Sequence, residues 1–299
     1  MDYKDYKRQV SLLLNVLPEV AKEDCFALHG GTAINLFIRD MPRLSVDIDL
    51  TYVPIENRPT SLKNIASALL RIRDRLEKLI PDIQMEHKRA VSKLLVTANG
   101  VNIKIEVNQV GRGTLYAPKK MALCKKAQTE FDAFCVVPLV PLAQLYGGKI
   151  CAALDRQHPR DLFDVKYLLD NEGFTDEVKT GFLLSLVGHD RPIHELIHPN
   201  SQDQRQTMIN HFEGMSAEKF TYDEFESTRA TLINKVSESL TENDKKFLLS
   251  VENVEPDWTI HDFERFPAVQ WKLQNLAKLK SINPEKHQEQ FELLKEKLT

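Results

Sequence analysis

The sequence has 299 residues, of which 42% are hydrophobic and 28% charged, and its formal net charge is -3. These values are typical of a globular chain of one large or two ordinary domains, and they exclude a disordered or strongly basic protein. No apolar run approaches the roughly 20 residues that span a bilayer, and the first ten residues lack a signal-peptide core. We therefore expect a cytoplasmic protein with no membrane partner.

The four cysteines contain no CxxC pair, and three of them have apolar neighbours. This pattern indicates reduced, mostly buried thiols and argues against a zinc site. The cysteines are Cys25, Cys124, Cys135 and Cys151.

The first elements in chain order alternate between helix and strand. Hydrophobic periodicity predicts helices over residues 5–20, 32–39 and 60–79 and strands over 25–28 and 44–53. Strand-like residues 93–97 and 101–107 then flank Asn99-Gly100, a strong hairpin signal. The first part of the chain is therefore predicted to form a small mixed sheet flanked by helices.

The second part of the sequence changes character and reads as a series of helices. They are predicted over residues 142–154, 161–169, 176–186, 202–211, 223–239, 242–251, 269–280 and 284–298. The stretch 111–138 has few periodic signals and is the expected join. We predict an α+β protein with a catalytic core over 1–137 and a helical domain over 138–299, packed tightly so that the second completes the active-site cleft.

The most informative stretch runs from Phe26 to Thr51. An apolar strand ends in Gly30-Gly31, and Asp47 and Asp49 lie two apart in a later β-branched strand. Residues two apart on a strand point to the same face, where two carboxylates repel each other unless a cation lies between them. A glycine turn nearby lets backbone amides approach phosphate oxygens. The pattern indicates a metal and a nucleoside triphosphate in one pocket.

A third carboxylate is expected from the strand 101–107. Ile103, Ile105 and Val107 alternate with Lys104, Glu106 and Asn108, so Glu106 lies on the polar face. If that face borders Asp47 and Asp49, Glu106 completes a site for Mg²⁺, with Mn²⁺ as the alternative. The competing interpretation is a half-exposed edge strand with solvated charges.

Two hydroxyl side chains lie beside these acids in the sequence. Thr32 either caps the following helix or donates its hydroxyl to a phosphate. Ser45 lies two residues before Asp47 and is either a neighbour of the metal and phosphate site or an ordinary strand serine.

A second polar cluster extends from Gly148 to Lys166. It carries the cations Lys149, Arg156 and Arg160, and the acids Asp161 and Asp164 share a helix face. Pro159 predicts a break between two helices. One interpretation is a solvated helix-turn-helix with internal ion pairs. The other is a triphosphate clamp in which the two acids orient the cations.

The segments GGTAINL, RLSVDIDL, KIEVN, GGKICAALDRQHPRDLFDVKYLL and FPAVQWKLQNL together resemble the AbiEii/MenT-type nucleotidyltransferase toxins of the DNA-polymerase-β-like superfamily. The resemblance extends from Phe26 to about Leu276. It implies a nucleotidyltransferase core followed by a helical domain.

The resemblance also implies roles for individual residues. The metal pair matches Asp47 and Asp49, with Glu106 as the third acid in place of the usual Asp. The triphosphate-binding glycines match Gly30 and Gly31, followed by Thr32 where the superfamily usually has Ser. Lys149 matches a lysine near the nucleotide phosphates. Asp161 matches a downstream acidic motif residue, with Arg156, Arg160 and Asp164 in the same motif.

The implied reaction is nucleotidyl transfer, in which an acceptor hydroxyl attacks the α-phosphate of an NTP and pyrophosphate leaves. Family members include enzymes that extend the 3′ end of tRNA, and such toxins are encoded beside a cognate antitoxin in toxin–antitoxin or abortive-infection systems that defend against phage. Residues 107–129 contain five basic residues and no acidic one, so they are candidates to guide RNA. These are Arg112, Lys119, Lys120, Lys125 and Lys126.

Other functions fit the same sequence. The acceptor is a tRNA or another RNA in the favoured hypothesis, and a protein or small-molecule hydroxyl in the first alternative. A non-catalytic NTP-binding module is the second alternative, and it requires Glu106 to face away from Asp47 and Asp49.

Overall fold

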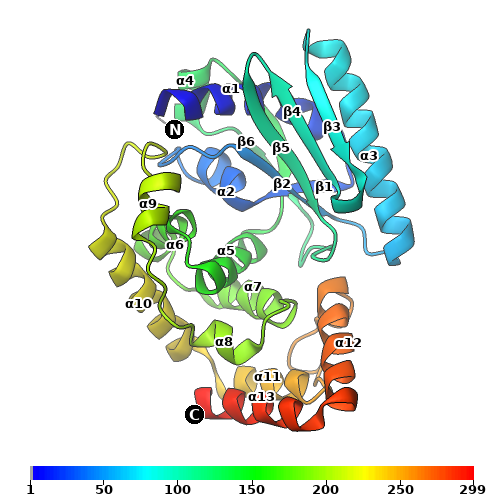
Figure 1. The fold of residues 1–299 in the computed structure, drawn as a ribbon, viewed down its shortest axis with the longest axis vertical. Coiled ribbons are helices and arrows are strands. Elements are labelled where there is room, and N and C mark those ends of the chain that lie inside the picture. The colour runs from blue at the N-terminus through cyan, green and yellow to red at the C-terminus, as the bar shows by residue number, and fades with distance from the viewer. Residues whose placement is uncertain (1–2) are drawn as a thin grey trace. The chain divides into compact units, whose positions relative to one another are not determined.

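The structure, a computed structural model, describes residues 3–299 as two compact units. The first unit contains the chain up to Pro141 together with Ile209–Lys219, and the second contains Leu142–Met208 and Phe220–Thr299. Strands lie in the first unit, and the second is helical (Figure 1). The predicted class, α+β with a mixed sheet and a helical second half, is confirmed.

Residues 3–299 contain a seven-stranded mixed sheet with the order β3-β4-β5-β2-β1-β7-β6. The central strand β2 pairs antiparallel with β1 and parallel with β5, and β1 also pairs parallel with β7. The strands are β1 (Phe26–His29), β2 (Asp47–Tyr52), β3 (Gln84–Lys88), β4 (Lys93–Ala98), β5 (Val101–Asn108), β6 (Lys119–Ala122) and β7 (Val136–Leu139).

The predicted hairpin is present as β4 and β5. Asn99 and Gly100 join them with φ angles of 52° and 71°, the left-handed pair that a tight turn of this kind requires. In contrast, the stretch 111–138, which we expected to be a join, forms β6, the helix α4 (Lys125–Phe131) and β7, so it completes one edge of the sheet.

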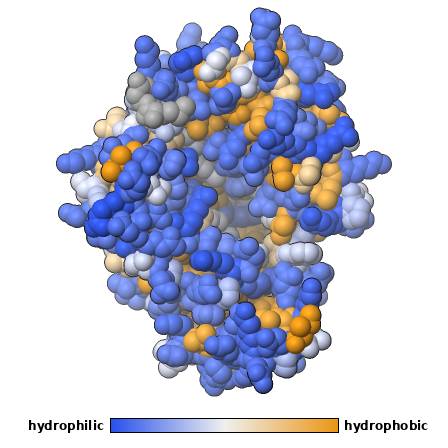
Figure 2. Space-filling model, in the orientation of Figure 1, coloured by the Kyte–Doolittle hydropathy of each residue, from blue (hydrophilic) through white to orange (hydrophobic). Residues whose placement is uncertain are grey.

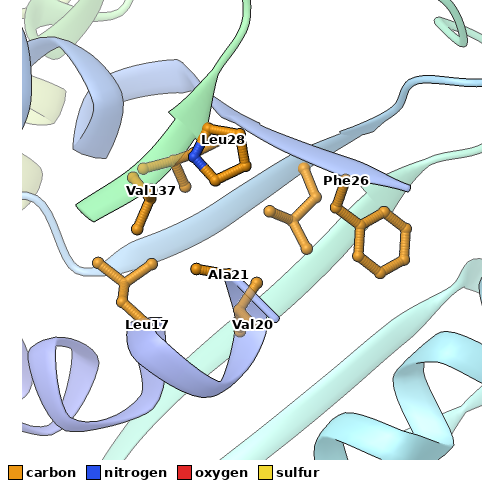
Figure 3. Close-up of a pocket in the computed structure, with 8 residues that line it drawn as sticks. Leu17, Val20, Ala21, Phe26, Leu28 and Val137 are labelled. Atoms are coloured by element: carbon orange, nitrogen blue, oxygen red, sulfur yellow. The ribbon is translucent and has the colours of Figure 1, made fainter. Parts of the chain in front are cut away.

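Two helices, α1 (Tyr3–Val20) and α3 (Arg58–Leu79), form the hydrophobic core of the first unit with the sheet. Figure 3 shows Leu17, Val20 and Ala21 facing side chains of β1 and β7. The space among them is about 10 Å³, roughly the volume that one water needs, so this region is packed core and no ligand site. The helix α1 continues through Pro18 to Val20, its predicted end, and it begins at Tyr3, two residues before its predicted start.

The helix after the glycine turn starts earlier than predicted. It comprises α2 (Gly30–Ala33) and a π-helical turn, η1 (Ile34–Ile38), in place of one helix over 32–39. The backbone N–H of Arg39 donates to the Ile34 carbonyl at 2.8 Å, five residues back. Such a wide turn is frequent at functional sites.

A short segment from late in the chain returns to the first unit. The backbone N–H of Leu44 donates to the Met215 carbonyl at 2.7 Å, and the Ser216 hydroxyl donates to the Pro42 carbonyl at 3.0 Å. Arg43 and Ser216 form an isolated β-bridge. The residues that lead into β2 are therefore held by a segment about 170 positions further along the chain.

The second unit packs α5 closely against α7. A side chain at Gly147 would place its Cβ 2.1 Å from the Gly181 carbonyl carbon, so only glycine allows this approach. The helices of this unit are α5 (Leu142–Arg156), α6 (Pro159–Asn171), α7 (Asp176–Val187), α8 (Ile193–Ile197), α10 (Tyr222–Ser239), α11 (Glu242–Glu252), α12 (Pro267–Ile282) and α13 (Pro284–Lys297). The remaining helix, α9 (Arg205–His211), continues into the returning segment.

The cysteines are free, as predicted, and Cys135 and Cys151 are buried whereas Cys25 and Cys124 are partly exposed. Burial raises the pKa of the Cys135 thiol to about 11 and that of Cys151 to about 12, so neither is a ready nucleophile.

Hydrophilic residues cover most of the face shown in Figure 2. None of the helices between Tyr3 and Thr299 is both long and apolar enough to cross a membrane.

Candidate active site

The predicted acids lie in one row on the polar face of the sheet. In the register of β2, Asp49 is opposite His29 on one side and Glu106 on the other, and Asp47 is opposite Lys104. Because Ile48 and Leu50 are buried on the opposite face, the structure brings Asp47, Asp49 and Glu106 together on one side. Their role as metal ligands remains a prediction.

Two lysines accompany these carboxylates. The Lys104 ammonium lies 3.7 Å from Asp47 Oδ2 and 3.6 Å from Glu106 Oε2, and Lys93 Nζ lies 3.0 Å from Glu106 Oε2. Across residues 3–299, no three His, Cys, Asp or Glu side chains are grouped closely enough to hold a metal ion as they stand. The donor set still suits a divalent cation, because carboxylate oxygens are the ligands that Mg²⁺ and Mn²⁺ prefer and a cation already lies between two of them.

The glycine turn lies directly against this row. Gly30 has a φ of +74°, and a Cβ there would be 2.6 Å from Asp49 Oδ2. A Cβ at Gly31 would be 2.6 Å from Arg43 Nη2 and 3.0 Å from Ser45 Oγ. Gly30 therefore requires glycine for its backbone conformation, and a side chain at Gly31 would displace Arg43.

Thr32 and Ser45 connect the turn to the start of β2. The Thr32 hydroxyl is fully buried, donates to the Asp47 carbonyl at 2.5 Å and lies 3.0 Å from Ser45 Oγ. Thr32 is inside α2 and does not cap it, since the N-cap position is occupied by His29. These contacts fix the turn relative to Asp47, and phosphate binding by either hydroxyl remains a prediction.

The second cluster is assembled around Asp161 in the helical unit. Lys149 Nζ of α5 donates to Asp161 Oδ1 at 2.8 Å and lies 3.1 Å from Asp164 Oδ2. Arg156 donates to both oxygens of Asp161, through Nε at 2.6 Å and Nη2 at 3.1 Å. Asp161, Asp164 and Lys149 are buried, whereas 61% of the Arg156 side chain is exposed. The ion pairs are thus internal and largely buried.

The surroundings of Asp161 keep it ionised. Burial would raise the pKa of this carboxyl, but the charges and hydrogen bonds of Lys149 and Arg156 hold it well below its ordinary range. The predicted break between helices is also present, because α6 starts at Pro159 and His158 caps it by accepting from the Arg160 N–H at 3.1 Å. Arg160 itself is half-buried at the first turn of α6.

The basic stretch divides into two groups. Lys119 and Lys120 of the edge strand β6 and Lys125 and Lys126 of α4 are exposed. Arg112, however, is buried and donates to the Glu56 carbonyl at 3.2 Å and to the Ser61 hydroxyl. Its inclusion in an RNA path is therefore wrong, because its guanidinium stabilises the loop before α3.

Sequence reasoning missed two residues of the site. Arg43 is buried beneath Gly31, and its side chain fills the space that a side chain at Gly31 would need. Lys104 shares the polar face with Glu106 and lies between the acids. The alternation of β5 placed Lys104 on that face, but a single lysine gave no indication of its partner.

The family model that matches the sequence is described as the nucleotidyl transferase AbiEii toxin of type IV toxin–antitoxin systems, and it covers residues 11–275. The chain belongs to this family. The AbiEii-family chain is thus a nucleotidyltransferase and the toxin of a toxin–antitoxin system, which implies an antitoxin partner. This confirms the family predicted from the sequence motifs. No curated protein matches the chain.

A solved structure supports the same fold. The chain is similar to MenT4, a nucleotidyltransferase toxin from Mycobacterium tuberculosis H37Rv, with a TM-score of 0.65 over 91% of this chain and 93% of that one. Because the two sequences are 13% identical, this likeness establishes the fold and carries no residue roles.

Proposed function

We propose that this AbiEii-family toxin transfers a nucleoside monophosphate from an NTP to the 3′-terminal hydroxyl of an RNA, with tRNA as the main acceptor. The acceptor oxygen forms a bond to the α-phosphorus, the bond from that phosphorus to the β-phosphate oxygen breaks, and pyrophosphate leaves. The observation that carries this proposal is the in-register row of Asp47, Asp49 and Glu106 directly against the Gly30-Gly31 turn.

Asp47, Asp49 and Glu106 would hold the divalent metal ion, and we propose Mg²⁺, or Mn²⁺ in its place. When bound, such an ion supplies charge neutralisation at the reacting phosphate and lowers the pKa of the attacking hydroxyl. Exchange of the Lys104 ammonium for a divalent ion would raise the positive charge between Asp47 and Glu106.

The glycine turn would hold the triphosphate. Its backbone approaches a ligand closely because neither glycine carries a side chain, and the buried Arg43 guanidinium beneath Gly31 favours an anion above it. Thr32 and Ser45 keep the turn in register with Asp47.

Lys149, Arg156 and Arg160 would offset the charge of the β- and γ-phosphates, as the family resemblance implies. The contact of Arg156 with Asp161 supports this role for Arg156, because it fixes a guanidinium whose side chain is 61% exposed, whereas Lys149 is buried between Asp161 and Asp164. That the helical unit completes the catalytic cleft stays part of the proposal.

The edge strand supports an RNA acceptor. Leu28 pairs with Leu50 and with Leu139, so these side chains share the apolar face. Lys120 pairs with Pro138, one residue before Leu139, and therefore lies on the polar face with Asp49. An exposed lysine on the face that carries the acids is placed to contact a phosphate backbone.

The two alternative functions fit the observations less well than RNA modification does. A non-catalytic module required Glu106 to face away from the aspartates, and the register places Glu106 beside Asp49. A protein or small-molecule acceptor uses the same acids, and Lys120 of β6 favours RNA over either. In the cell we propose that RNA modification in the cytoplasm arrests growth, as in abortive infection by phage.

The test is incubation of the purified protein with each α-labelled NTP, Mg²⁺ and tRNA, followed by mapping of the labelled end. We expect label on the RNA 3′ terminus with the wild type and none with Asp47→Asn of equal thermal stability. Label on protein or on small alcohols in parallel reactions, with none on RNA, would contradict the proposed acceptor.

A further inference from the structure

A cavity of about 380 Å³ opens on the polar face of the first unit. Its lining includes His29, Asp49 and Glu106 of the row, together with Asn108, Gln109 and Val91. Pockets that bind small ligands have volumes of about 300 to 1,000 Å³, so this one accommodates a nucleoside.

The glycine turn lies at the start of β2 and approaches Asp49, and the cavity extends from Asp49 toward the end of β2. Gly31, Thr32 and Ser45 gather near Asp47, at the start of β2. The register pairs Thr51 with Asn108, so Asn108 lies toward the other end of β2. At about 3.3 Å per residue, Asp47 and Thr51 are about 13 Å apart. A group in the cavity would therefore approach the acids from the side away from the triphosphate.

Two side-chain amides line this cavity. In each, one polar atom is hydrogen-bonded to the protein and the other has no partner among residues 3–299. Asn108 Oδ1 accepts from the backbone N–H groups of Val110 at 2.9 Å and Gly111 at 2.8 Å. Gln109 Nε2 donates to the Ala90 carbonyl at 3.0 Å and to Ser92 Oγ at 2.9 Å. Neither Asn108 Nδ2 nor Gln109 Oε1 has a hydrogen-bond partner among residues 3–299. Because Asn108 and Gln109 both line the cavity, a ligand there can reach one donor and one acceptor.

The loop after β5 is built to keep Asn108 in this orientation. A Cβ at Gly111 would be 3.0 Å from Asn108 Nδ2, tighter than ordinary contact, so glycine leaves the amide its space. The two backbone N–H donors hold Oδ1 toward the loop and so fix the orientation of the Asn108 amide.

We propose that this cavity binds the terminal nucleoside of the acceptor, and that Asn108 Nδ2 and Gln109 Oε1 bond to the edge of its base. The inference rests on the proposed nucleotidyl transfer to RNA. Each nucleobase edge offers an acceptor next to a donor, and unstacked RNA ends are read through such edges. The cavity would place the ribose of that nucleoside beside Asp49 and Glu106, where its hydroxyl attacks.

The test uses two substitutions. Each removes the amide atom that lacks a partner and keeps a group that can make the hydrogen bonds to the protein. Asn108→Asp retains the oxygen that accepts from Val110 and Gly111 but loses the donor. Gln109→Lys retains a donor toward Ala90 and Ser92 but loses the acceptor. We expect each to raise the KM for the RNA acceptor about 5- to 10-fold, as loss of one hydrogen bond implies, with the KM for the NTP changed less than twofold.

The two substitutions change charge in opposite directions, which separates base recognition from general attraction of RNA. If charge alone mattered, Gln109→Lys would lower the acceptor KM while Asn108→Asp raised it, and that result would overturn the proposal. Asn102→Asp is the matched control, because Asn102 lies on the same face of β5 outside the cavity and also accepts through Oδ1, from Thr97 at 2.6 Å. It should leave both KM values unchanged.

A second arm uses an RNA whose 3′-terminal ribose lacks its base. The wild type should show a KM for this acceptor higher than that of Asn108→Asp for the normal end, because the base loses both hydrogen bonds, and Asn108→Asp should raise it no further. An abasic end that is used as well as the normal one, or variants that change the NTP KM alone, would refute base binding in this cavity.

A binding arm is independent of transfer. Titration of the wild type and Asn108→Asp with nucleoside monophosphates should show weaker binding to the variant. If the wild type extended no RNA yet bound nucleoside monophosphates through Asn108, the proposed function would fail and the cavity assignment would hold.

Discussion

The ammonium group of Lys104 lies 3.7 Å from a carboxylate oxygen of Asp47, its in-register partner on the neighbouring parallel strand. The same ammonium lies 3.6 Å from Glu106. A protein cation thus neutralises part of the charge that a divalent ion would neutralise, so lysine and metal compete for the same carboxylates.

We predict that Lys104→Met tightens the binding of Mg²⁺ by about two- to fivefold. This factor corresponds to the free energy of a half-exposed ion pair. Calorimetric titration with Mg²⁺ and Mn²⁺ measures this change directly. Lys88→Met is the control, because Lys88 pairs with Glu86 on β3 at the same distance of 3.6 Å. Equal or weaker metal binding by the Lys104 variant would show that the two cations do not compete.

Gly30 and Gly173 have nearly the same backbone φ angle, so substitutions at the two positions can be compared. Gly30→Ala and Gly173→Ala both introduce a side chain at a φ near +75°, which costs about 1–2 kcal/mol of stability. A Cβ at Gly30 meets Asp49, whereas a Cβ at Gly173 meets nothing within 4 Å. We expect a loss in stability at least as large for Gly30→Ala as for Gly173→Ala, and at least a tenfold loss of transfer rate only for Gly30→Ala. Equal rates would mean that the position of Asp49 is not critical.

The low pKa of Asp161 predicts how stability depends on pH. A carboxyl whose pKa is depressed in the folded state stabilises that state above its unfolded pKa of about 4, and this contribution is lost as pH falls toward the folded value. Urea unfolding between pH 7 and pH 2 should therefore show stability falling below about pH 4 in the wild type, and a shallower fall in Asp161→Asn.

At pH 7 the same Asp161→Asn variant should lose about 3–5 kcal/mol, because Lys149 is buried and loses one of its two anions. Asp170→Asn on the same helix removes an exposed ion pair with Lys166 and should cost less than about 1 kcal/mol. Similar costs for the two variants would contradict the importance of burial.

The lysines of β6 predict the salt dependence of transfer to RNA. Lys119→Glu with Lys120→Glu should raise the KM for RNA and lower the slope of log affinity against log salt by about 0.7, for the one phosphate contact of Lys120 on a single strand, since Lys119 pairs with Leu139 on the apolar face. The control is Lys235→Glu with Lys246→Glu, which makes the same change in net charge on exposed residues of α10 and α11. Identical slopes for both double variants would argue against RNA contact at β6.

The sequence predicted β5 well because this strand is long and alternates strictly. In β5, buried Ile103, Ile105 and Val107 alternate with polar residues, and Asn99-Gly100 fixes the turn before it. The alternation placed Glu106 on the polar face, and the parallel pairing with β2 places it beside Asp49.

The edge of the sheet was not predictable in the same way. Each of β6 and β7 has four residues, too few for a period-two pattern to be distinct, and β7 contains Pro138. Their identity as strands depends on pairing with each other and with β1. The burial of Arg112 likewise depends on Ser61 and Glu56, about 50 positions earlier, which no local pattern reveals.

The returning segment 209–219 has a consequence for synthesis of the toxin. The entry to β2 is held by Met215 and Ser216, so it gains these hydrogen bonds only after the ribosome has translated well past the middle of the gene. A prematurely terminated chain that ends before this segment would carry every predicted metal ligand and still lack these contacts. Activity that depends on them would thus require translation beyond Ser216.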